Sequence, residues 1–367
     1  MISLFSRIFP TPAFIRFPAV GFDISDQSIK IAELKQTTRG IILRQYGRIS
    51  LSPGIVKDGK VIDGKRFVAI LQEAKKNFDL SFVRASLPEE QAYLFTEEIP
   101  LVDAKEIRQT IELSLEQHIP IPSRETVFDY DIVSVTDKTI VVQVIAMHSE
   151  TISKYLALFE EAGINVLSFE LEAQAVARVI VPKTDAGTYM VLDIGETSTG
   201  MSIISHGRVW STVSLDTSGD ILTKVIEEKL AVPHDQAETL KQTIGLLPDV
   251  ENTLVRDVLL GPIALLRDEL NTRLIFWHTH KNDDVIPHGK VEHVYLCGGN
   301  ANMKGLSEYL SQTLRLPVSL AKLWEVIPHP SHYIPDMEQE ASLGYATALG
   351  LALGSLNDDG LDTSISI

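Results

Sequence analysis

The sequence predicts an α/β protein with two lobes of similar design and a small insert in the first lobe. A strand, an aspartate, a turn of small and hydroxyl residues and a second strand occur at residues 20–34 and again at 190–204, so both halves open alike. Helical spacing then follows strand-like alternation in each half. The chain of 367 residues also exceeds the size that one core usually supports.

In the first half, residues 19–49 alternate apolar and polar side chains and are expected to form a three-strand meander. The insert, at about 88–148, is expected to contain a strand, a helix and two strands. Asp103 and Glu106 have the spacing of a capping box at the start of its helix. The other expected elements are a helix at 63–78, a strand at 84–87, a helix at 150–162, a strand at 166–169 and a helix at 171–181.

The second half restarts the meander after a polar boundary at 182–187. Its expected strands are 190–194, 199–205, 208–214, 291–297 and 318–320, and its expected helices are 218–229, 235–245, 250–276, 304–314 and 341–353. The resulting divisions are a leader at 1–18, a first lobe at 19–182, a second lobe at 183–354 and a disordered tail at 355–367.

The two aspartate turns have the chemistry of a phosphate-binding site. Gly195 and Ser25 are small, so the backbone can approach a ligand closely. Lys30 adds a positive charge, and backbone amides and hydroxyls can donate to phosphate oxygens. Each turn alone is more often an ordinary hairpin; the two turns together with the third motif described below favour a phosphate site. The hydroxyl donors would be Ser28, Thr197, Ser198 and Thr199.

Asp23 and Asp193 end the first strand of each hairpin. Magnesium prefers one or two carboxylates and several waters, so these two residues are predicted to hold a hydrated Mg²⁺.

In a third motif, at 294–306, an apolar strand is followed by Gly298 and Gly299 and then by a helix. Glycine lets a flat base or ribose lie against bare backbone, and a helix start favours anionic groups. Asn300 and Met303 belong to the same turn and are included in the predicted nucleotide site.

The charge and the termini restrict the partners. Asp and Glu outnumber Lys and Arg by 49 to 33, a formal net charge of −16, which disfavours nucleic acid. The single cysteine, Cys297, allows no intrachain disulfide.

The apolar leader is interrupted by Pro10 and Pro12 and is too short to span a bilayer, although it could rest on a membrane surface. We therefore expect a cytoplasmic protein.

With two aspartate hairpins and a Gly-Gly turn in this order, the chain resembles the actin-like ATPase superfamily, whose fold has two RNase H-like lobes. The resemblance implies that the hairpins are the two phosphate loops, that the Gly-Gly turn is the adenosine loop, and that the ligands are ATP or ADP with Mg²⁺. It also implies nucleoside contacts from Gly219 and from an Ala-Glu-x-x-Lys helix that contains Glu238 and Lys241. Ser25 and Glu196 depart from the pattern, which implies a slow ATPase at most.

Within the superfamily the insert is similar to that of the PilM family of type IV pilus assembly proteins, through residues 115–122 and the strand that follows. This resemblance implies an assembly scaffold, peripheral to the inner membrane, of a pilus or a related type II secretion machine. It would bind the cytoplasmic N-terminal peptide of a PilN-like membrane protein in a groove between the first lobe and the insert. Leu101, Ile107, Ile111 and Leu115 are candidates for shaping that groove, although an apolar stripe of this kind is more often simply core.

Two alternatives remain open. One is a small-molecule kinase of the same fold, which would need a carboxylate base for its substrate hydroxyl. The other is a self-associating, membrane-associated filament protein like FtsA. Phosphoryl transfer to sugars and co-sedimentation with ATP would test them.

Overall fold

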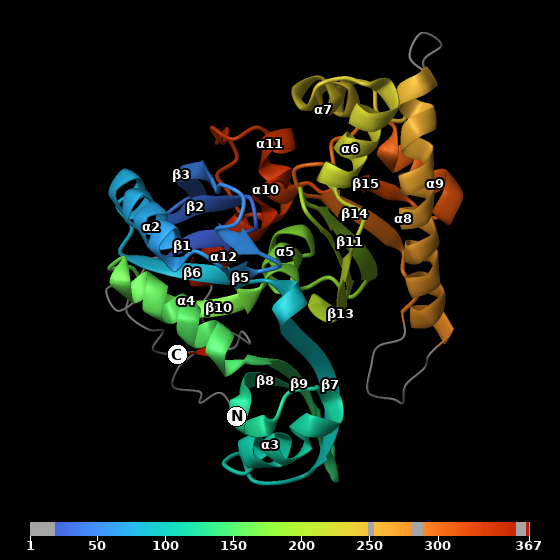
Figure 1. Ribbon diagram of the computed structural model, residues 1–367. Coiled ribbons are helices and arrows are strands. Elements are labelled where there is room, and N and C mark those ends of the chain that lie inside the picture. The colour runs from blue at the N-terminus through green and yellow to red at the C-terminus, as the bar shows by residue number, and fades with distance from the viewer. Residues whose placement is uncertain (1–18, 249–252, 280–288, 357–364, 367) are drawn as a thin grey trace.

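The computed structural model describes residues 19–248, 253–279, 289–356 and 365–366. Two sheets with covering helices form two lobes, and helices α5 (Glu172–Ile180) and α12 (Ala346–Leu356) lie between them (Figure 1). A smaller third sheet extends below the first lobe. The leader at 1–18 and most of the predicted tail lie outside the described residues. None of the helices within the described ranges is both long and apolar enough to cross a membrane.

The first lobe contains a six-stranded sheet in the order β16-β10-β6-β1-β2-β3. β1 pairs with β2 in antiparallel fashion and with β6 in parallel fashion. Helix α2 begins after its N-cap Asp63, and its apolar residues Phe67, Leu71 and Ala74 face the core. The elements are β1 (Val20–Ile24), β2 (Ser28–Thr37), β3 (Gly40–Ser50), β4 (Val56–Lys57), β5 (Lys60–Val61), α2 (Gly64–Phe78), β6 (Phe82–Leu87), α4 (Ser149–Glu161), β10 (Asn165–Leu171) and β16 (Ile365–Ser366).

The second lobe repeats this plan. Its sheet order, β13-β12-β11-β14-β15, matches β3-β2-β1-β6-β10 strand for strand, with β11 antiparallel to β12 and parallel to β14. The elements are β11 (Thr188–Ile194), β12 (Thr199–Ser205), β13 (Arg208–Leu215), α6 (Gly219–Leu230), α7 (His234–Thr243), α8 (Thr253–Thr279), β14 (His293–Cys297), α9 (Leu306–Leu314), β15 (Val318–Leu320), α10 (Leu323–Val326) and α11 (Gln339–Leu343).

The insert has the predicted order of strand, helix, strand and strand. Its sheet order is β7-β9-β8, and α3 packs on one face. Central strand β9 is buried almost throughout, as its continuous apolar run predicts. The elements are the 3₁₀ turn η2 (Glu89–Gln91), β7 (Ala92–Pro100), α3 (Ile107–His118), η3 (Ser123–Glu125), β8 (Thr126–Val135) and β9 (Thr139–His148).

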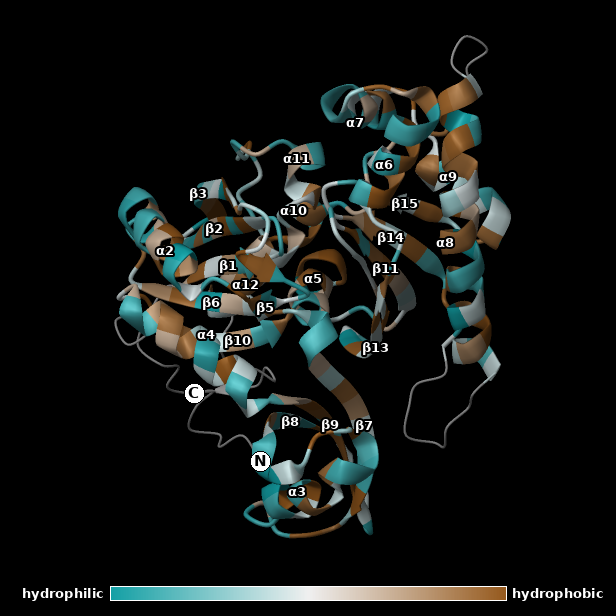
Figure 2. Cartoon of the chain, in the orientation of Figure 1, coloured by the Kyte–Doolittle hydropathy of each residue, from teal (hydrophilic) through white to brown (hydrophobic). Residues whose placement is uncertain are grey.

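Helices α5 and α12 cross closely between the lobes. A Cβ on Gly350 of α12 would lie 1.9 Å from the carbonyl oxygen of Ala175 in α5, and one on Gly21 of β1 would lie 1.9 Å from that of Ala348. Hydrophobic residues colour α5 and the central strands around it, whereas α2 alternates between hydrophobic and hydrophilic residues (Figure 2). The absence of side chains at these two glycines therefore sets how closely the lobes approach.

Some element boundaries differ from the sequence prediction. The helix expected at 341–353 is divided into α11 and α12, because the chain turns at Gly344 and the carbonyl of Leu343 accepts a hydrogen bond from Gly298. Helix α3 begins at Ile107, and only half of the capping box forms: the Glu106 carboxylate accepts from the Asp103 amide at 3.4 Å. The short hairpin β4–β5, helix α10 and strand β16 were not predicted.

Candidate functional site

A cleft of about 380 Å³ opens between the two lobes. Both aspartate turns, the Gly-Gly turn after β14 and the facing ends of α5, α6 and α7 contribute to its walls. The cleft thus lies at the carboxyl ends of the parallel strand pairs β1–β6 and β11–β14, which is where α/β folds bind ligands.

The first turn is held by its own serines. The Ser25 amide and hydroxyl both donate to the Ser28 carbonyl, at 2.9 and 3.0 Å, and the Ser28 amide donates to the Ser25 hydroxyl at 3.2 Å. The hydroxyl that stands where the superfamily pattern has glycine therefore stabilises the turn.

The second turn depends on Gly195 for its tightness. The Gly195 amide donates to the Ser198 carbonyl at 2.9 Å, and a Cβ on Gly195 would lie 2.7 Å from that oxygen. The sequence interpretation assigned this glycine to close approach of a ligand. In the structure its first requirement is the turn itself, because any side chain would strike the turn's own backbone.

Asp23 and Asp193 face the cleft from the ends of β1 and β11. Lys30 lies opposite Asp23 on the neighbouring strand, with its Nζ 3.9 Å from Oδ2. Burial raises the pKa of Asp193 to about 6, and Asp23 adds to this effect while Lys30 opposes it. Burial also raises the pKa of Asp23, against Lys30 and a hydrogen bond from Ser86.

Two further carboxylates sit beside this pair. Glu172, the first residue of α5, lines the cleft, and burial together with the charges of Asp23 and Glu89 raises its pKa well above the usual range. Glu89 accepts from the Ala173 amide at 3.0 Å at the start of α5, and burial raises its pKa to about 7. Arg48 and Lys241 also line the cleft, but they pair with Glu196 and Glu238, so Lys30 is left to balance the charge of these four carboxylates.

This donor set fits a hydrated divalent cation. A magnesium ion bound through one or two carboxylates and several waters would supply the missing positive charge next to Asp23 and Asp193. No cluster of three or more His, Cys, Asp or Glu placed to ligate a metal directly occurs among the residues described. The site therefore fits water-mediated magnesium and does not fit a closed structural metal centre.

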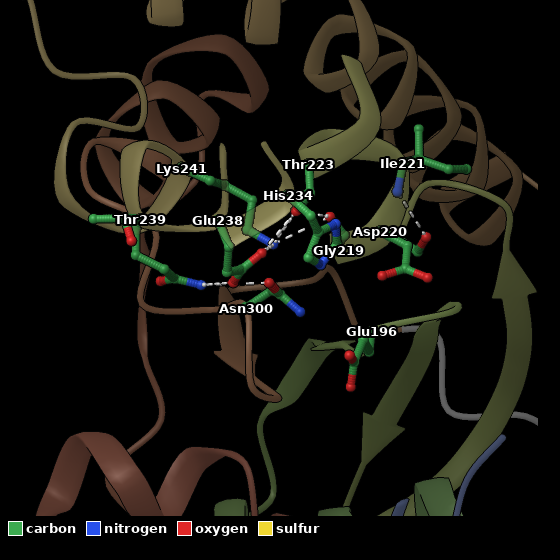
Figure 3. A network of polar contacts seen from close by, with 12 residues as sticks. Glu196, Gly219, Asp220, Ile221, Thr223, His234, Glu238, Thr239, Lys241 and Asn300 are labelled. Atoms are coloured by element: carbon green, nitrogen blue, oxygen red, sulfur yellow. Dashed lines mark hydrogen bonds and ion pairs between the residues drawn. The ribbon is translucent and has the colours of Figure 1, made fainter. Parts of the chain in front are cut away.

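The opposite end of the cleft is a polar network around Lys241 (Figure 3). The Lys241 side chain is 2% exposed, and its Nζ lies 2.6 Å from the Glu238 carboxylate, 2.9 Å from the Thr223 hydroxyl and 3.1 Å from the Gly219 carbonyl. Burial works to raise the pKa of Glu238, but hydrogen bonds from Lys241 and Thr223 outweigh it and the pKa is lowered. This pairing satisfies a buried ammonium and fixes α7 against α6.

Asn300 joins that network to the second turn. Its amide nitrogen donates to the Gly195 carbonyl at 3.0 Å, and its oxygen accepts from Gln242 at 3.4 Å. A Cβ on Gly219 would strike the Asn300 side chain, whereas one on Gly299 would meet nothing within 4 Å. Gly299 therefore presents open, unobstructed backbone to the cleft, the surface that a base or ribose requires.

The cleft brings together most of the predicted nucleotide-binding residues. Those that line it are Asp23, Ser25, Ser28, Lys30, Asp193, Gly195, Thr197, Ser198, Glu238, Lys241, Gly299 and Asn300.

The other predicted residues of the site lie just behind its wall. The Thr199 hydroxyl is buried and donates to the Thr217 carbonyl at 2.6 Å. Gly298 has a φ of +92°, and a Cβ there would strike Asp193. Gly219 accepts from Lys241, and Met303 is buried in the core. These residues shape the cleft from behind.

Sequence reasoning missed Glu172 and Arg48 as cleft residues. Glu172 carried a usable signal, because it directly follows the strand β10 and the carboxyl ends of such strands face the ligand. Arg48 reaches the cleft through tertiary contacts alone. Arg48 pairs with Glu196 of the other lobe at 2.8 Å, and Gln27 donates to Asp220 at 2.8 Å, so two polar contacts bridge the mouth of the cleft.

The residues predicted to contact a partner do not line a groove beside the first lobe. Ile107, Ile111 and Leu115 are buried in the core of the insert. Leu101 is 49% exposed, but it follows the end of β7 that pairs with Thr139, and its amide donates to the Lys138 carbonyl in the turn between β8 and β9. The helical spacing of the three buried residues marks a core face, and this part of the prediction is corrected.

The two lobes have the same strand order, and crossing helices join them. An aspartate turn from each lobe faces the cleft between them. This combination defines an actin-like ATPase fold. The family model of the type IV pilus assembly protein PilM matches residues 21–356, and the chain belongs to this family. The predicted fold and family are thereby confirmed.

Known proteins similar to the chain agree with this assignment. The structure of a PilM–PilN type IV pilus biogenesis complex matches with a TM-score of 0.78 and 23% identity, over 93% of this chain and 99% of that one. MreB5 of Spiroplasma citri bound to AMPPNP matches with a TM-score of 0.56 and 14% identity, over 92% and 95% of the two chains. These likenesses show the fold.

Cell division protein FtsA of Pseudomonas aeruginosa is 25% identical over 228 residues, or 56% of this chain. The match spans 51% of FtsA, about half its length.

Proposed function

We propose that the cleft binds ATP or ADP with Mg²⁺, and that the protein is a scaffold of type IV pilus assembly. The observation that carries the nucleotide proposal is the convergence of two aspartate turns and an unobstructed Gly-Gly turn on one cleft. Asp23 and Asp193 would hold the hydrated ion, and the two turns would donate to the phosphates. Gly299, Asn300 and the Glu238–Lys241 pair would contact the nucleoside.

The bound Mg²⁺ would neutralise phosphate charge. Burial raises the pKa of Glu172 well above its usual range, which favours the protonated form in the nucleotide-free cleft, and a protonated carboxyl cannot take a proton from water. Any hydrolysis is therefore expected to be slow, and the nucleotide would mainly tie the two lobes together.

The cross-cleft pair of Arg48 and Glu196 is expected to slow nucleotide exchange. Both side chains are nearly half exposed, at 46% and 43%, so Arg48→Gln should change the free energy of unfolding by less than about 1 kcal/mol. Because the pair closes the mouth of the cleft, the same change should accelerate release of a fluorescent ATP analogue severalfold in stopped-flow measurements.

Lys322→Gln provides the control for that experiment, because Lys322 and Glu325 form an exposed pair at 2.8 Å outside the cleft. Equal release rates in the wild type and Arg48→Gln would show that the pair has no role in exchange.

For the partner, we propose the cytoplasmic N-terminal peptide of a PilN-like inner-membrane protein, which would place the chain at the inner membrane. Family membership and the similar PilM–PilN complex support this proposal. Docking a peptide costs ordering entropy, so a preformed groove would help, and binding as a scaffold needs no hydrolysis.

A fluorescently labelled partner peptide should bind the wild type and Asp193→Asn with affinities within about threefold, since the Asp193 change leaves the peptide groove intact. Anisotropy titration measures this, with a scrambled peptide as the control. Loss of peptide binding in a folded Asp193→Asn variant would replace the scaffold with a nucleotide-driven switch.

The FtsA match favours one other candidate, a filament-forming protein. Sedimentation of the purified protein at high concentration with Mg²⁺ and ATP distinguishes the two candidate functions. A filament-forming protein would pellet, whereas a scaffold would stay in the supernatant.

A further inference from the structure

The first-lobe sheet ends in a strand supplied by the C-terminal end of the chain. β16 pairs with β10 in antiparallel fashion, with Phe169 opposite Ile365 and Ser168 opposite Ser366. On its other side β10 pairs with β6. Without β16, β10 would be an edge strand, and its unpaired N–H and C=O groups would be a template for another extended segment.

Besides pairing with β10, strand β16 contacts the insert. β16 also lies against β8 of the insert, so it occupies the space between the first-lobe sheet and the insert. The family resemblance implies that the partner peptide also binds between the first lobe and the insert.

The pairing of β16 is short enough to be reversible. It spans two residues of each strand, and each hydrogen bond contributes about 1 kcal/mol net. Its advantage over a separate peptide is its covalent attachment, which gives an effective concentration on the order of millimolar. An extended peptide that makes a longer ladder on β10 would therefore compete successfully.

We propose that β16 is a built-in competitor, which occupies the β10 edge until an extended partner peptide adds to the sheet in its place. Main-chain hydrogen bonds give such strand addition its affinity, so two unrelated segments can share one edge. The identity of the partner as a PilN-like N-terminal peptide rests on the proposed function; the occupancy of the edge by β16 does not. A partly occupied edge lowers the apparent affinity in proportion to the free fraction.

The test uses the full-length chain and the double variant I365P/S366P. Proline removes the backbone donor at both positions, so the ladder with β10 cannot form. The control variant, I365V/S366T, keeps both donors and has β-branched residues that favour strands. Hydrogen exchange of the β10 segment, residues 165–171, is measured first, and then the affinity for the labelled partner peptide.

We expect the proline variant to exchange faster at β10 than the wild type and the control variant, and to bind the partner peptide roughly three- to tenfold more tightly. If hydrogen exchange at β10 is the same in the proline variant and the wild type, β16 does not occupy the edge, regardless of the measured peptide affinity. Faster exchange with an unchanged peptide affinity would overturn the competition. If no variant binds the partner peptide while β10 exchange rises, the proposed partner fails and the occupancy of the edge by β16 stands.

Discussion

Gly350→Ala is expected to destabilise the protein by about 3 kcal/mol or more. The new methyl group would lie 1.9 Å from the carbonyl oxygen and 2.4 Å from the carbonyl carbon of Ala175. Both atoms belong to the backbone of α5, which cannot rotate away as a side chain can, so the helices must separate. Because α5 and α12 lie between the two lobes, the separation would also widen the cleft.

Gly261→Ala is the matched control. Gly261 lies in the interior of α8, and a Cβ there would meet no atom within 4 Å outside its own stretch of helix. Alanine has the better helix propensity, but the ring of the next residue, Pro262, crowds a Cβ in helical conformation, so we expect the stability to change by less than about 1 kcal/mol. Denaturant unfolding of both variants measures the contrast. A Gly350→Ala protein as stable as the wild type would contradict the close crossing of α5 and α12.

Asp193→Asn is expected to stabilise the nucleotide-free protein at pH 8 and to weaken binding of magnesium nucleotide. An aspartate whose folded pKa is raised from 3.8 to about 6 destabilises the fold increasingly as pH rises through that interval, and fully above it. The shift corresponds to at most about 3 kcal/mol. Because the carboxylate keeps some exposure to the cleft, we expect a gain of about 1–2 kcal/mol from asparagine at pH 8.

At pH 4 the two proteins should have nearly equal stability, because Asp193 is then protonated in the folded wild type. The nucleotide effect has the opposite sign, since asparagine lacks the charge that holds the ion, and affinity should fall at least tenfold. Asp268→Asn, at an exposed position of α8, is the control and should show neither effect. A loss of stability in Asp193→Asn at pH 8 would contradict the proposed charge balance of the cleft.

The strands and helices that frame the cleft follow from local sequence patterns. Alternation of apolar and polar residues predicted both meanders, and the helical spacing of apolar residues over 63–78 predicted α2. The Gly-Gly turn was recognisable because Gly298 and Gly299 follow a short apolar strand. These features depend on residues a few positions apart, which a single sequence displays.

Features that depend on distant segments were not predictable. The pair of Arg48 and Glu196 joins residues 148 positions apart, and β16 is two residues long and takes its conformation from β10. The break at Gly344 depends on a hydrogen bond from Gly298. In the insert, the stripe through Ile111 gave the correct helix but the wrong surface, because periodicity identifies an apolar face and not what covers it.

The most direct test of the central claim is a calorimetric titration of the wild type with ATP at pH 7.5, once with Mg²⁺ and once with EDTA. Carboxylates crowd the cleft around Lys30, so a nucleotide without a divalent cation would be repelled. We predict one site per chain with Mg²⁺ and at least tenfold weaker binding in EDTA. No binding with Mg²⁺, or equal affinity in EDTA, would contradict the assignment of the cleft as a magnesium–nucleotide site.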